Sequence, residues 1–252
     1  MSRAEFMGTA ADFPEPFRLL IRESVESTND EVRTLAQAGA PDGLIVLAER
    51  QTAGRGRRGA AWFSPTGESL AFSVLLRPTE PKALWPRLAL AAGLAVTEAV
   101  ESFGLQAGIK WPNDVWIGQR KVAGILVEAG ADFAVVGIGL NVNSIEFPPE
   151  VSEIATSLRI EASRDFSRAE VLRAIISKLT LRRRLIGNDF DALISAIKLR
   201  CVLTGNRVSL TTASGPRIGT VEGIAAGGEL LLRTDNGLER LIQADEVRLL
   251  PP

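Results

Sequence analysis

The sequence has no histidine and a single cysteine, Cys201, among its 252 residues. One cysteine cannot form a disulfide within the chain, which fits a reducing compartment. The lack of histidine excludes Ser-His-Asp and Cys-His catalytic units, and it also excludes the usual Cys/His structural zinc site. Any chemistry must therefore rely on carboxylates, lysine, arginine, backbone amides or a hard metal ion.

The chain also lacks an excess of charge and a long apolar run. Its formal net charge is -1, which argues against a generally basic nucleic-acid-binding surface. No apolar run reaches the ~18–20 residues needed to span a bilayer, and residues 1–17 contain no apolar signal core. We therefore expect a cytoplasmic protein that binds neither DNA nor membranes, with residues 1–17 as a loose leader outside the fold.

The pattern of apolar segments divides the rest of the chain into two parts. Residues 18–200 alternate groups of strands with helices, which is typical of an α+β domain. Residues 204–252 contain short strands separated by Gly, Asn and Asp, which indicates a small β-barrel. We expect helices at 27–39, 84–104, 167–187 and 189–200; strands at 43–50, 69–77 and 133–142; three strands within 105–130; and C-terminal strands at 207–212, 217–224, 229–234 and 238–243.

The segment TAGRGRRGAAWFSP, residues 52–65, places three glycines and three arginines within six residues. Its glycines satisfy G-x-G-x-x-G, but no helix pattern follows, so the dinucleotide-binding interpretation fails. Glycines let backbone amides approach an anion, and guanidinium groups bind phosphate and carboxylate in bidentate fashion. We therefore predict an anion-binding loop rather than a solvated hairpin tip. Trp62 is either core filler or a platform for a purine.

A second candidate segment is KWPNDVWIGQRKVAGILVE, residues 110–128. Lys110, Asn113 and Asp114 flank a proline-containing turn, and Asp114 is a candidate metal carboxylate. Lys121 begins an otherwise apolar strand. Simple alternation places it on one face with Ala123 and Ile125, where it is either a lysine reaching outward to solvent or a cation that faces a ligand.

The third segment is GIGLNVN, residues 137–143. Gly137 and Gly139 weaken a strand unless another group must approach closely. Alternation places Asn141 and Asn143 on one face, where they can orient phosphate or metal-bound water. An ordinary strand that ends in polar residues explains this segment equally well.

In this order, and followed by a small β-domain, the three segments resemble the biotin protein ligases. The resemblance runs from about Glu23 to the C-terminus. It implies a mixed β-sheet flanked by helices in residues 18–200, related to class II aminoacyl-tRNA synthetases and lipoate ligases, and an SH3-like domain in residues 204–252. It also implies two reactions: biotin and ATP form biotinyl-5′-AMP, and a lysine of a biotin carboxyl carrier protein then displaces AMP.

The resemblance further implies roles for individual residues, with ATP, biotin and Mg²⁺ as ligands. Lys121 would contact both the biotin carboxylate and the α-phosphate, with Arg55 and Arg57 closing over them. Asp114 would serve the metal or the attacking lysine. The catalytic set is Lys121, Arg55, Arg57 and Asp114. The biotin-binding set is Ser27, Thr28, Gln51, Gly54, Arg55, Arg57, Lys121 and Gly137. The ATP-binding set is Arg57, Arg58, Trp62, Asn113, Lys121 and Asn141.

One departure and several alternatives accompany this interpretation. Ala60 stands where the family's loop often has an arginine, so that residue's role does not transfer. Many bacterial relatives carry an N-terminal winged helix and act as repressors, whereas we expect this chain to be a ligase without operator binding. A lipoate or octanoate ligase on the same scaffold is the nearest alternative, and a non-catalytic nucleotide-binding regulator is a second one. Monomer and homodimer are both open.

Overall fold

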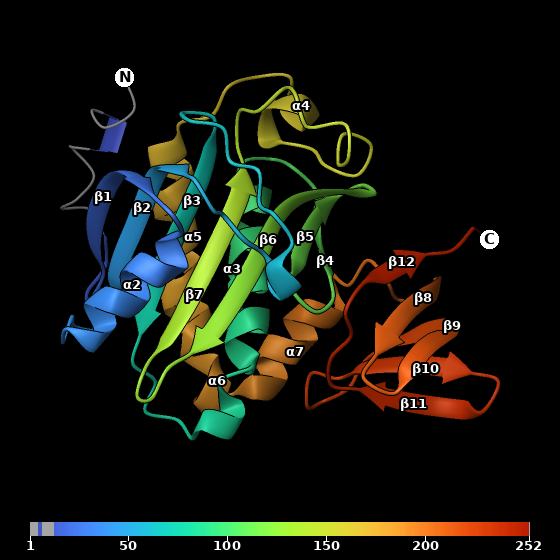
Figure 1. Cartoon of the computed structure of the whole chain (residues 1–252). Coiled ribbons are helices and arrows are strands. Elements are labelled where there is room, and N and C mark those ends of the chain that lie inside the picture. Colours follow the sequence, from blue (N-terminus) through green and yellow to red (C-terminus); the bar gives the residue numbers. More distant parts are fainter. Residues whose placement is uncertain (1–4, 7–12, 252) are drawn as a thin grey trace.

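The computed structural model describes residues 5–6 and 13–251, which form two β-sheets with helices around the larger one (Figure 1). The larger sheet has seven strands in the order β1-β2-β3-β7-β6-β5-β4. It is mixed, because β1 and β2 are parallel and every other neighbouring pair is antiparallel. Its strands are β1 (Arg18–Val25), β2 (Leu44–Gln51), β3 (Ser69–Leu76), β4 (Ala107–Lys110), β5 (Asp114–Ile117), β6 (Arg120–Ala129) and β7 (Ala134–Asn141).

Helices cover both faces of this sheet. Figure 1 shows α2 in front of it, with α3 and α5 behind. Alternating residues of the central strands feed two cores: Val46 and Leu75 belong to the cluster under α2, whereas Leu47 and Val74 belong to the larger cluster on the opposite face. The helices are α2 (Thr28–Gln37), α3 (Arg87–Ser102), α4 (Leu158–Ala162), α5 (Arg168–Arg183), α6 (Leu185–Asn188) and α7 (Phe190–Lys198), with short 3₁₀ turns η1 (Arg57–Gly59) and η2 (Lys82–Leu84).

The expected α+β architecture is confirmed, and most expected elements are present. Helix α2 ends two residues before Gly39, whose φ of +91° suits a glycine. Ser167 caps α5, since its hydroxyl accepts a hydrogen bond from the Glu170 N–H. The predicted C-terminal boundary of this helix, residue 187, is wrong. Helix α5 ends at Arg183, and a separate short helix, α6, follows it.

The expectation of a loose leader is wrong for the part of it that the structure describes. Phe6, Phe13 and Phe17 are buried in the larger core. Arg168, only 2% exposed, is paired with Glu5 and with the buried Glu49. Burial of these three aromatic side chains holds residues 5–6 and 13–17 on the domain. Residues 1–4 and 7–12 lie outside the described residues.

The second sheet is antiparallel and lies beside α7 in Figure 1. It packs on the first domain rather than standing apart, since the Trp111 indole N–H donates to the Gly228 carbonyl at 3.0 Å. The short last strand was not expected. The strands are β8 (Arg207–Thr212), β9 (Gly215–Ile224), β10 (Leu230–Thr234), β11 (Gly237–Leu241) and β12 (Val247–Leu249), in the order β11-β10-β9-β8-β12. Within the described part of the chain, no helix has the length and apolar character needed to cross a membrane.

Candidate functional site

The residues singled out from the sequence converge on one cavity of about 1130 Å³. Its wall is formed by β6, β7, the start of α2 and the arginine loop, and residues 245–249 of the second sheet complete it. Every residue of the predicted catalytic, biotin-binding and ATP-binding sets lines this cavity except Gly54, which lies at the base of the loop. Those lining it are Ser27, Thr28, Gln51, Arg55, Arg57, Arg58, Trp62, Asn113, Asp114, Lys121, Gly137 and Asn141.

A β-bulge decides where the Lys121 side chain points. Trp116 of β5 pairs with Lys121 while its neighbour Val115 pairs with Ala123, so Val122 is an extra residue. The expected face is therefore wrong: Ala123 is buried in the larger core, whereas Lys121 and Gly124 both face the cavity. A bulge reverses the alternation downstream of it, and nothing in the local sequence marks its position.

The backbone and the ammonium group of Lys121 are both fixed. Its N–H donates to the Ile154 carbonyl at 2.7 Å, and its carbonyl accepts from the Thr156 N–H at 2.9 Å. The ammonium Nζ lies 2.8 Å from Asp114 Oδ1. The cavity therefore holds a positioned cation whose counterion is supplied by the neighbouring strand.

Two glycines make room for Trp62 against the sheet. A Cβ atom at Gly139 would lie 2.2 Å from the Trp62 ring, and one at Gly124 would lie 3.3 Å from it. The indole Nε1 is buried and has no hydrogen-bond partner among the residues that the structure describes, and Lys121 Nζ lies 5.5 Å from the ring centroid. The close approach expected at Gly139 is thus present, and the group that approaches is the aromatic residue of the arginine loop.

Gly137 makes room for the side chain of Asn29. A Cβ atom there would lie 2.2 Å from Asn29 Oδ1. Asn29 Oδ1 also lies 2.6 Å from Ser73 Oγ, and the Asn29 amide donates to Glu128 at 2.6 Å. Gly137 therefore admits a buried polar side chain that the sequence did not reveal as part of the site.

A chain of polar groups closes the α2 end of the cavity. Gln51 Oε1 accepts from the Thr28 backbone N–H at 2.8 Å and from its hydroxyl at 3.1 Å. Ser73 Oγ lies 2.7 Å from Thr28 Oγ1. The adjacent Ser27 is 4% exposed and its side chain makes no capping bond to α2. Apolar Phe72, Leu126 and Ile138 line the same cavity, so its interior combines an apolar body with a polar end.

Arg55 is engaged by carboxylates rather than directed into open space. Its guanidinium donates to both oxygens of Asp30, at 2.5 and 2.6 Å, and lies 3.5 Å from Glu128. This bidentate pair with Arg55 holds the pKa of Asp30 below its usual 3.8, and the same pair raises the pKa of Arg55. Arg55 thus anchors the N-terminal side of the loop to α2.

Arg57 and Asn113 are brought together although 56 residues separate them in the sequence. Arg57 donates to Asn113 Oδ1 at 3.0 Å and to the Ala244 carbonyl at 2.9 Å, and the Asn113 amide donates to the Ile125 carbonyl at 2.9 Å. Burial lowers the pKa of Arg57, and the nearby Asp114 opposes that shift. A guanidinium stays charged in spite of such burial.

The two asparagines of the GIGLNVN segment lie in different surroundings. Asn141 lies at the end of β7, lines the cavity, and donates to the Thr156 carbonyl at 2.9 Å. Asn143 does not line it; its side chain bonds the backbone of Phe166 through both amide atoms. Of the two explanations left open for this segment, the ordinary structural one holds for Asn143, because the strand ends between the two asparagines; a ligand role for Asn141 stays a prediction.

Two parts of the site had no role assigned from the sequence. Lys110 lines the cavity, with Nζ 4.5 Å from the Trp116 ring centroid. Burial lowers the pKa of Lys110, and Asp114 opposes this effect. The C-terminal segment 245–249 also lines the cavity. Lys110 could have been found from its position beside Asn113 and Asp114, whereas residues 245–249 carry no local signal of their role.

Cations outnumber carboxylates around the cavity, which therefore favours anionic ligands. Six cationic side chains line it, against three acidic ones. Within the described part of the chain, no cluster of three or more His, Cys, Asp or Glu residues could hold a metal ion by itself. The cations are Arg55, Arg57, Arg58, Lys110, Lys121 and Arg248; the acids are Asp114, Asp245 and Glu246.

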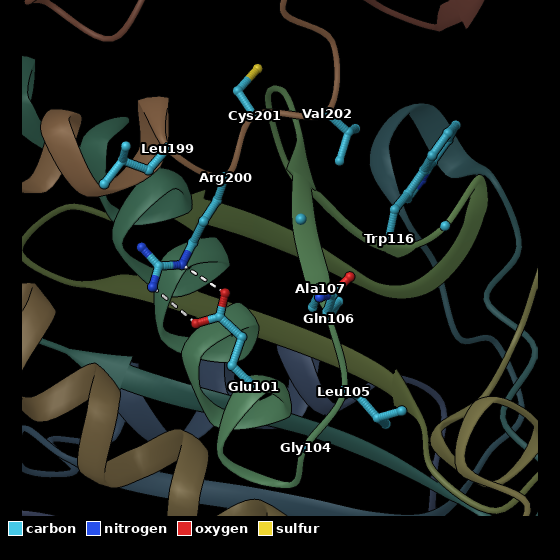
Figure 2. A pocket seen from close by; sticks show the side chains of 12 residues that line it. Glu101, Gly104, Leu105, Gln106, Ala107, Trp116, Leu199, Arg200, Cys201 and Val202 are labelled. Carbon is cyan, nitrogen blue, oxygen red and sulfur yellow. Dashed lines mark hydrogen bonds and ion pairs between the residues drawn. The ribbon is translucent and has the colours of Figure 1, made fainter.

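A second hollow, of about 660 Å³, lies beside β4 and residues 199–202 (Figure 2). Figure 2 shows Arg200 and Glu101 paired there, with Arg200 Nε 2.9 Å from the Glu101 carboxylate. Trp116 lines both hollows. The second one contains none of the residues expected to act in catalysis.

Comparisons with known proteins identify the family of the chain. Residues 21–143 match the profile of the biotin/lipoate A/B protein ligase family. The bifunctional ligase/repressor BirA of Bacillus subtilis is 35% identical over 236 residues, which cover 90% of this chain and 73% of that protein. The biotin--[acetyl-CoA-carboxylase] ligase of Paracoccus denitrificans is 33% identical, covering 88% of this chain and 96% of that one.

Solved structures show the same fold. The biotin protein ligase from Aquifex aeolicus, in complex with biotin and ATP, superposes with a TM-score of 0.84 at 33% identity and covers 92% of this chain and 99% of its own. The biotin protein ligase from Leishmania major, in complex with biotinyl-5-AMP, has a TM-score of 0.60 at 27% identity and covers 91% of this chain and 100% of its own.

Proposed function

Because the chain belongs to the biotin/lipoate A/B protein ligase family, we propose that it joins biotin to a lysine of a biotin carrier protein, using ATP and passing through biotinyl-5′-AMP. The observation that carries the proposal is the single cavity in which Lys121, the arginine loop and a polar inner end meet. The same arrangement explains how such a reaction proceeds without histidine.

The first step joins two anions, and the cationic lining meets that requirement. The biotin carboxylate attacks the α-phosphorus of ATP, the Pα–O bond to the β-phosphate breaks, and pyrophosphate leaves. The barrier consists largely of mutual repulsion and of positioning. Lys121 lies on β6, and its ammonium Nζ is 2.8 Å from Asp114 Oδ1. It supplies positive charge where the two reactants meet. Arg57 supplies a second charge from the loop.

The polar end of the cavity suits the ureido ring of biotin. Thr28, Gln51 and Ser73 form a connected set of donors and acceptors there, and Ser27 adds a hydroxyl beside them. A lipoyl or octanoyl chain offers no hydrogen-bonding partner to these groups, whereas a ureido ring can use the donors and acceptors that their mutual bonds leave over. The polar end therefore favours biotin over the alternative acids.

The opposite end suits the nucleotide. We assign Asn113, Asn141 and Arg58, which line the cavity, to the nucleotide, together with Trp62, which lies on the glycines of β6 and β7. Magnesium ions usually bind through one or two carboxylates together with substrate phosphates, and Asp114 fits that arrangement. Asp114 with the ATP phosphates would hold Mg²⁺, which would neutralise phosphate charge.

The second step transfers the acyl group to the carrier. The neutral amine of the carrier lysine attacks the carbonyl carbon of the mixed anhydride, an amide bond forms, and the bond to the phosphate oxygen breaks as AMP leaves with its electrons. The attacking nitrogen must lose one proton as the amide forms, and we assign Asp114, a carboxylate that lines the cavity, as its acceptor. The names of the relatives support a carrier protein of a biotin-dependent carboxylase as the partner.

Three finer points belong to the same proposal. The second antiparallel sheet, with its five short strands, is the SH3-like domain of residues 204–252. The catalytic domain is residues 18–200, related to the class II synthetases. The protein works in the cytoplasm, in keeping with its one cysteine.

Mass spectrometry tests the proposal directly. The purified chain, ATP, Mg²⁺, biotin and a carrier domain should increase the carrier mass by one biotinyl group. ATP–pyrophosphate exchange should depend on biotin and should respond weakly to lipoate or octanoate. Exchange driven equally well by an acid without a ureido ring would favour the lipoate-type ligase, and no exchange with any acid would favour a regulator.

A further inference from the structure

The arginine loop is a closed structure with its own backbone pairing. The Gly56 N–H donates to the Ala60 carbonyl at 2.6 Å, and the Trp62 N–H donates to the Gly54 carbonyl at 2.9 Å. Arg55 and Ala61 form an isolated antiparallel bridge. The loop is therefore paired with itself through its backbone, and contacts at its base and at its tip attach it to the rest of the protein.

Its base is attached to the first domain. Arg55 donates to both oxygens of Asp30 on α2, and Glu128 of β6 lies 3.5 Å away. The Asp30 carboxylate is in turn held by Arg33 at 2.9 Å. These contacts hold the base of the loop and involve no residue of the second sheet.

Its tip is attached to the second sheet. The Arg58 guanidinium forms an ion pair with Asp245, and Arg57 donates to the neighbouring Ala244 carbonyl at 2.9 Å. The Asp245 side chain is 16% exposed, and its backbone N–H donates to the Thr211 carbonyl of β8 at 2.9 Å. Asp245 is thus a half-buried carboxylate held on the second sheet and directed at the loop.

The backbone of the loop supports this contact. Arg58 has a φ of +56° in the left-handed region, and Gly59 follows it at +75°. A non-glycine residue in that region is uncommon and needs support from its surroundings. The ion pair with Asp245 gives the Arg58 side chain such support.

We propose that Asp245 is a positioning residue that pins the tip of the arginine loop over the cavity, so that the second sheet sets how long the acyl-adenylate is retained. The retention part rests on the proposed function, whereas the pinning does not. Trp62 pairs with Gly54 at the base and lies against the larger sheet, so releasing the tip would uncover the cavity on the side of the second sheet.

The ion pair between Arg58 and Asp245 is weak enough to let the arginine loop open. Arg58 is 66% exposed, and ion pairs with an exposed partner contribute little, with a median near 0–1 kcal/mol. Such a contact biases a local opening equilibrium without locking it. Removing the charge of Asp245 should raise the open population about threefold to fivefold.

Limited trypsin digestion measures that population in the intact protein. The variant Asp245→Asn keeps every arginine of the loop, so the cleavage sites after Arg55, Arg57 and Arg58 are unchanged. We expect nicking at these sites to be about threefold to fivefold faster than in the wild type. Equal rates in the two proteins would overturn the proposal.

Two further variants serve as controls. Glu239→Gln removes a carboxylate from another arginine pair of the second sheet, Arg217–Glu239 at 2.9 Å, and should leave nicking of the loop at the wild-type rate. Asp245→Glu keeps the charge and should restore most of the protection. Faster nicking in Glu239→Gln as well, or no restoration in Asp245→Glu, would show that the effect comes from general loosening of the domain.

A second measurement links the contact to the reaction. With biotin and ATP but no carrier, Asp245→Asn should form biotinyl-AMP in a burst of unchanged rate and release it about threefold to fivefold faster. A slower burst with unchanged release would overturn the positioning role. If wild-type protein makes no adenylate, the proposed function fails, and the digestion experiment still decides whether Asp245 pins the loop.

Discussion

The cavity is built from two regions that differ in how their side chains are held. Lys121, Gly124, Gly137, Gly139 and Asn141 lie on adjacent strands, where ladder hydrogen bonds fix them. The arginine loop is held by its own short pairing and by side-chain contacts to α2, to Asn113, to β6 and β7 and to the second sheet. The sheet side therefore provides fixed charge and shape, and the loop side provides charge that can be withdrawn.

This difference suits a reaction with a reactive intermediate. Groups that must meet the developing charge work best when they need no rearrangement. A cover, in contrast, must exclude water during the first step and open for the carrier lysine in the second. We therefore expect substitutions on the strands to affect the chemical step, and substitutions in the loop to affect retention.

The largest expected effect is that of Lys121→Ala. Removing a positioned cation from the reacting centre should slow adenylation by about 10²–10³-fold, or about 3–4 kcal/mol. ATP–pyrophosphate exchange measures this loss. The exposed lysine of α7 serves as the control, since Lys198→Ala should leave the rate unchanged. Adenylation near the wild-type rate in Lys121→Ala would remove this residue from the mechanism.

The next effect tests the contact between the two regions. A Cβ atom at Gly139 would lie 2.2 Å from the Trp62 ring, so Gly139→Ala should displace the indole and lower stability by about 1–3 kcal/mol. Tryptophan fluorescence and urea unfolding measure both consequences. In Gly93→Ala on α3, where the nearest atom would be 4.0 Å away, stability should be unchanged or raised by up to about 1 kcal/mol.

The third prediction concerns the loop alone. Arg57→Ala removes the donor to Asn113 and to the Ala244 carbonyl together with a charge facing the adenylate. Loss of a charged hydrogen bond of about 1.5 kcal/mol should speed release of biotinyl-AMP about tenfold, with a smaller change in the KM for ATP. A filter-binding chase and steady-state kinetics compare the two. If Arg57→Ala changed the release rate of biotinyl-AMP and the KM for ATP by the same factor, the proposed difference in role between the loop and the strands would be wrong.

The smallest effect concerns the base of the loop and its pH dependence. Arg55 lowers the pKa of Asp30 below 3.8, so the ionised carboxylate stabilises the fold at neutral pH. That contribution is present above the ordinary pKa and is lost as pH falls through the lowered one. Because Asp30 is 42% exposed, Asp30→Asn should reduce the free energy of unfolding by about 1 kcal/mol or less at neutral pH.

Urea unfolding at several pH values checks the sign of this effect. The difference between wild type and Asp30→Asn should shrink as pH falls below 3.8. A difference that stays constant into acid would show that the carboxylate's charge plays no part. The variant Asp191→Asn, which alters an exposed residue of α7, should show no comparable pH dependence.

Much of the fold could be predicted because local signals mark its elements. Gly39, Ser167 and the Gly118 turn lie where helices and a hairpin begin or end. The pairing of distant strands has no local signal. The α2 core and the opposite core share β2, and only the sheet order assigns Val46 to one and Leu47 to the other.

The candidate site shows the same division. The glycines, arginines, Lys121 and Asp114 were identifiable because their chemistry is unusual for a strand or a turn. The face of Lys121 was predicted wrongly, since a bulge at Val122 is set by pairing with β5. Asn29 and Ser73 escaped notice, because ordinary polar residues gain importance only when burial removes them from water.

The amino-acid sequence by itself determined the chemistry: no imidazole, a cluster of guanidinium groups, one strand lysine with a nearby carboxylate, and glycines where something must come close. These features depend on residue type and near spacing, which the chain carries locally. Only the tertiary structure decided that Arg55 pairs with α2 while Arg58 pairs with Asp245, 187 positions away. Contacts at that separation arise from packing of the two sheets, and no local pattern encodes them.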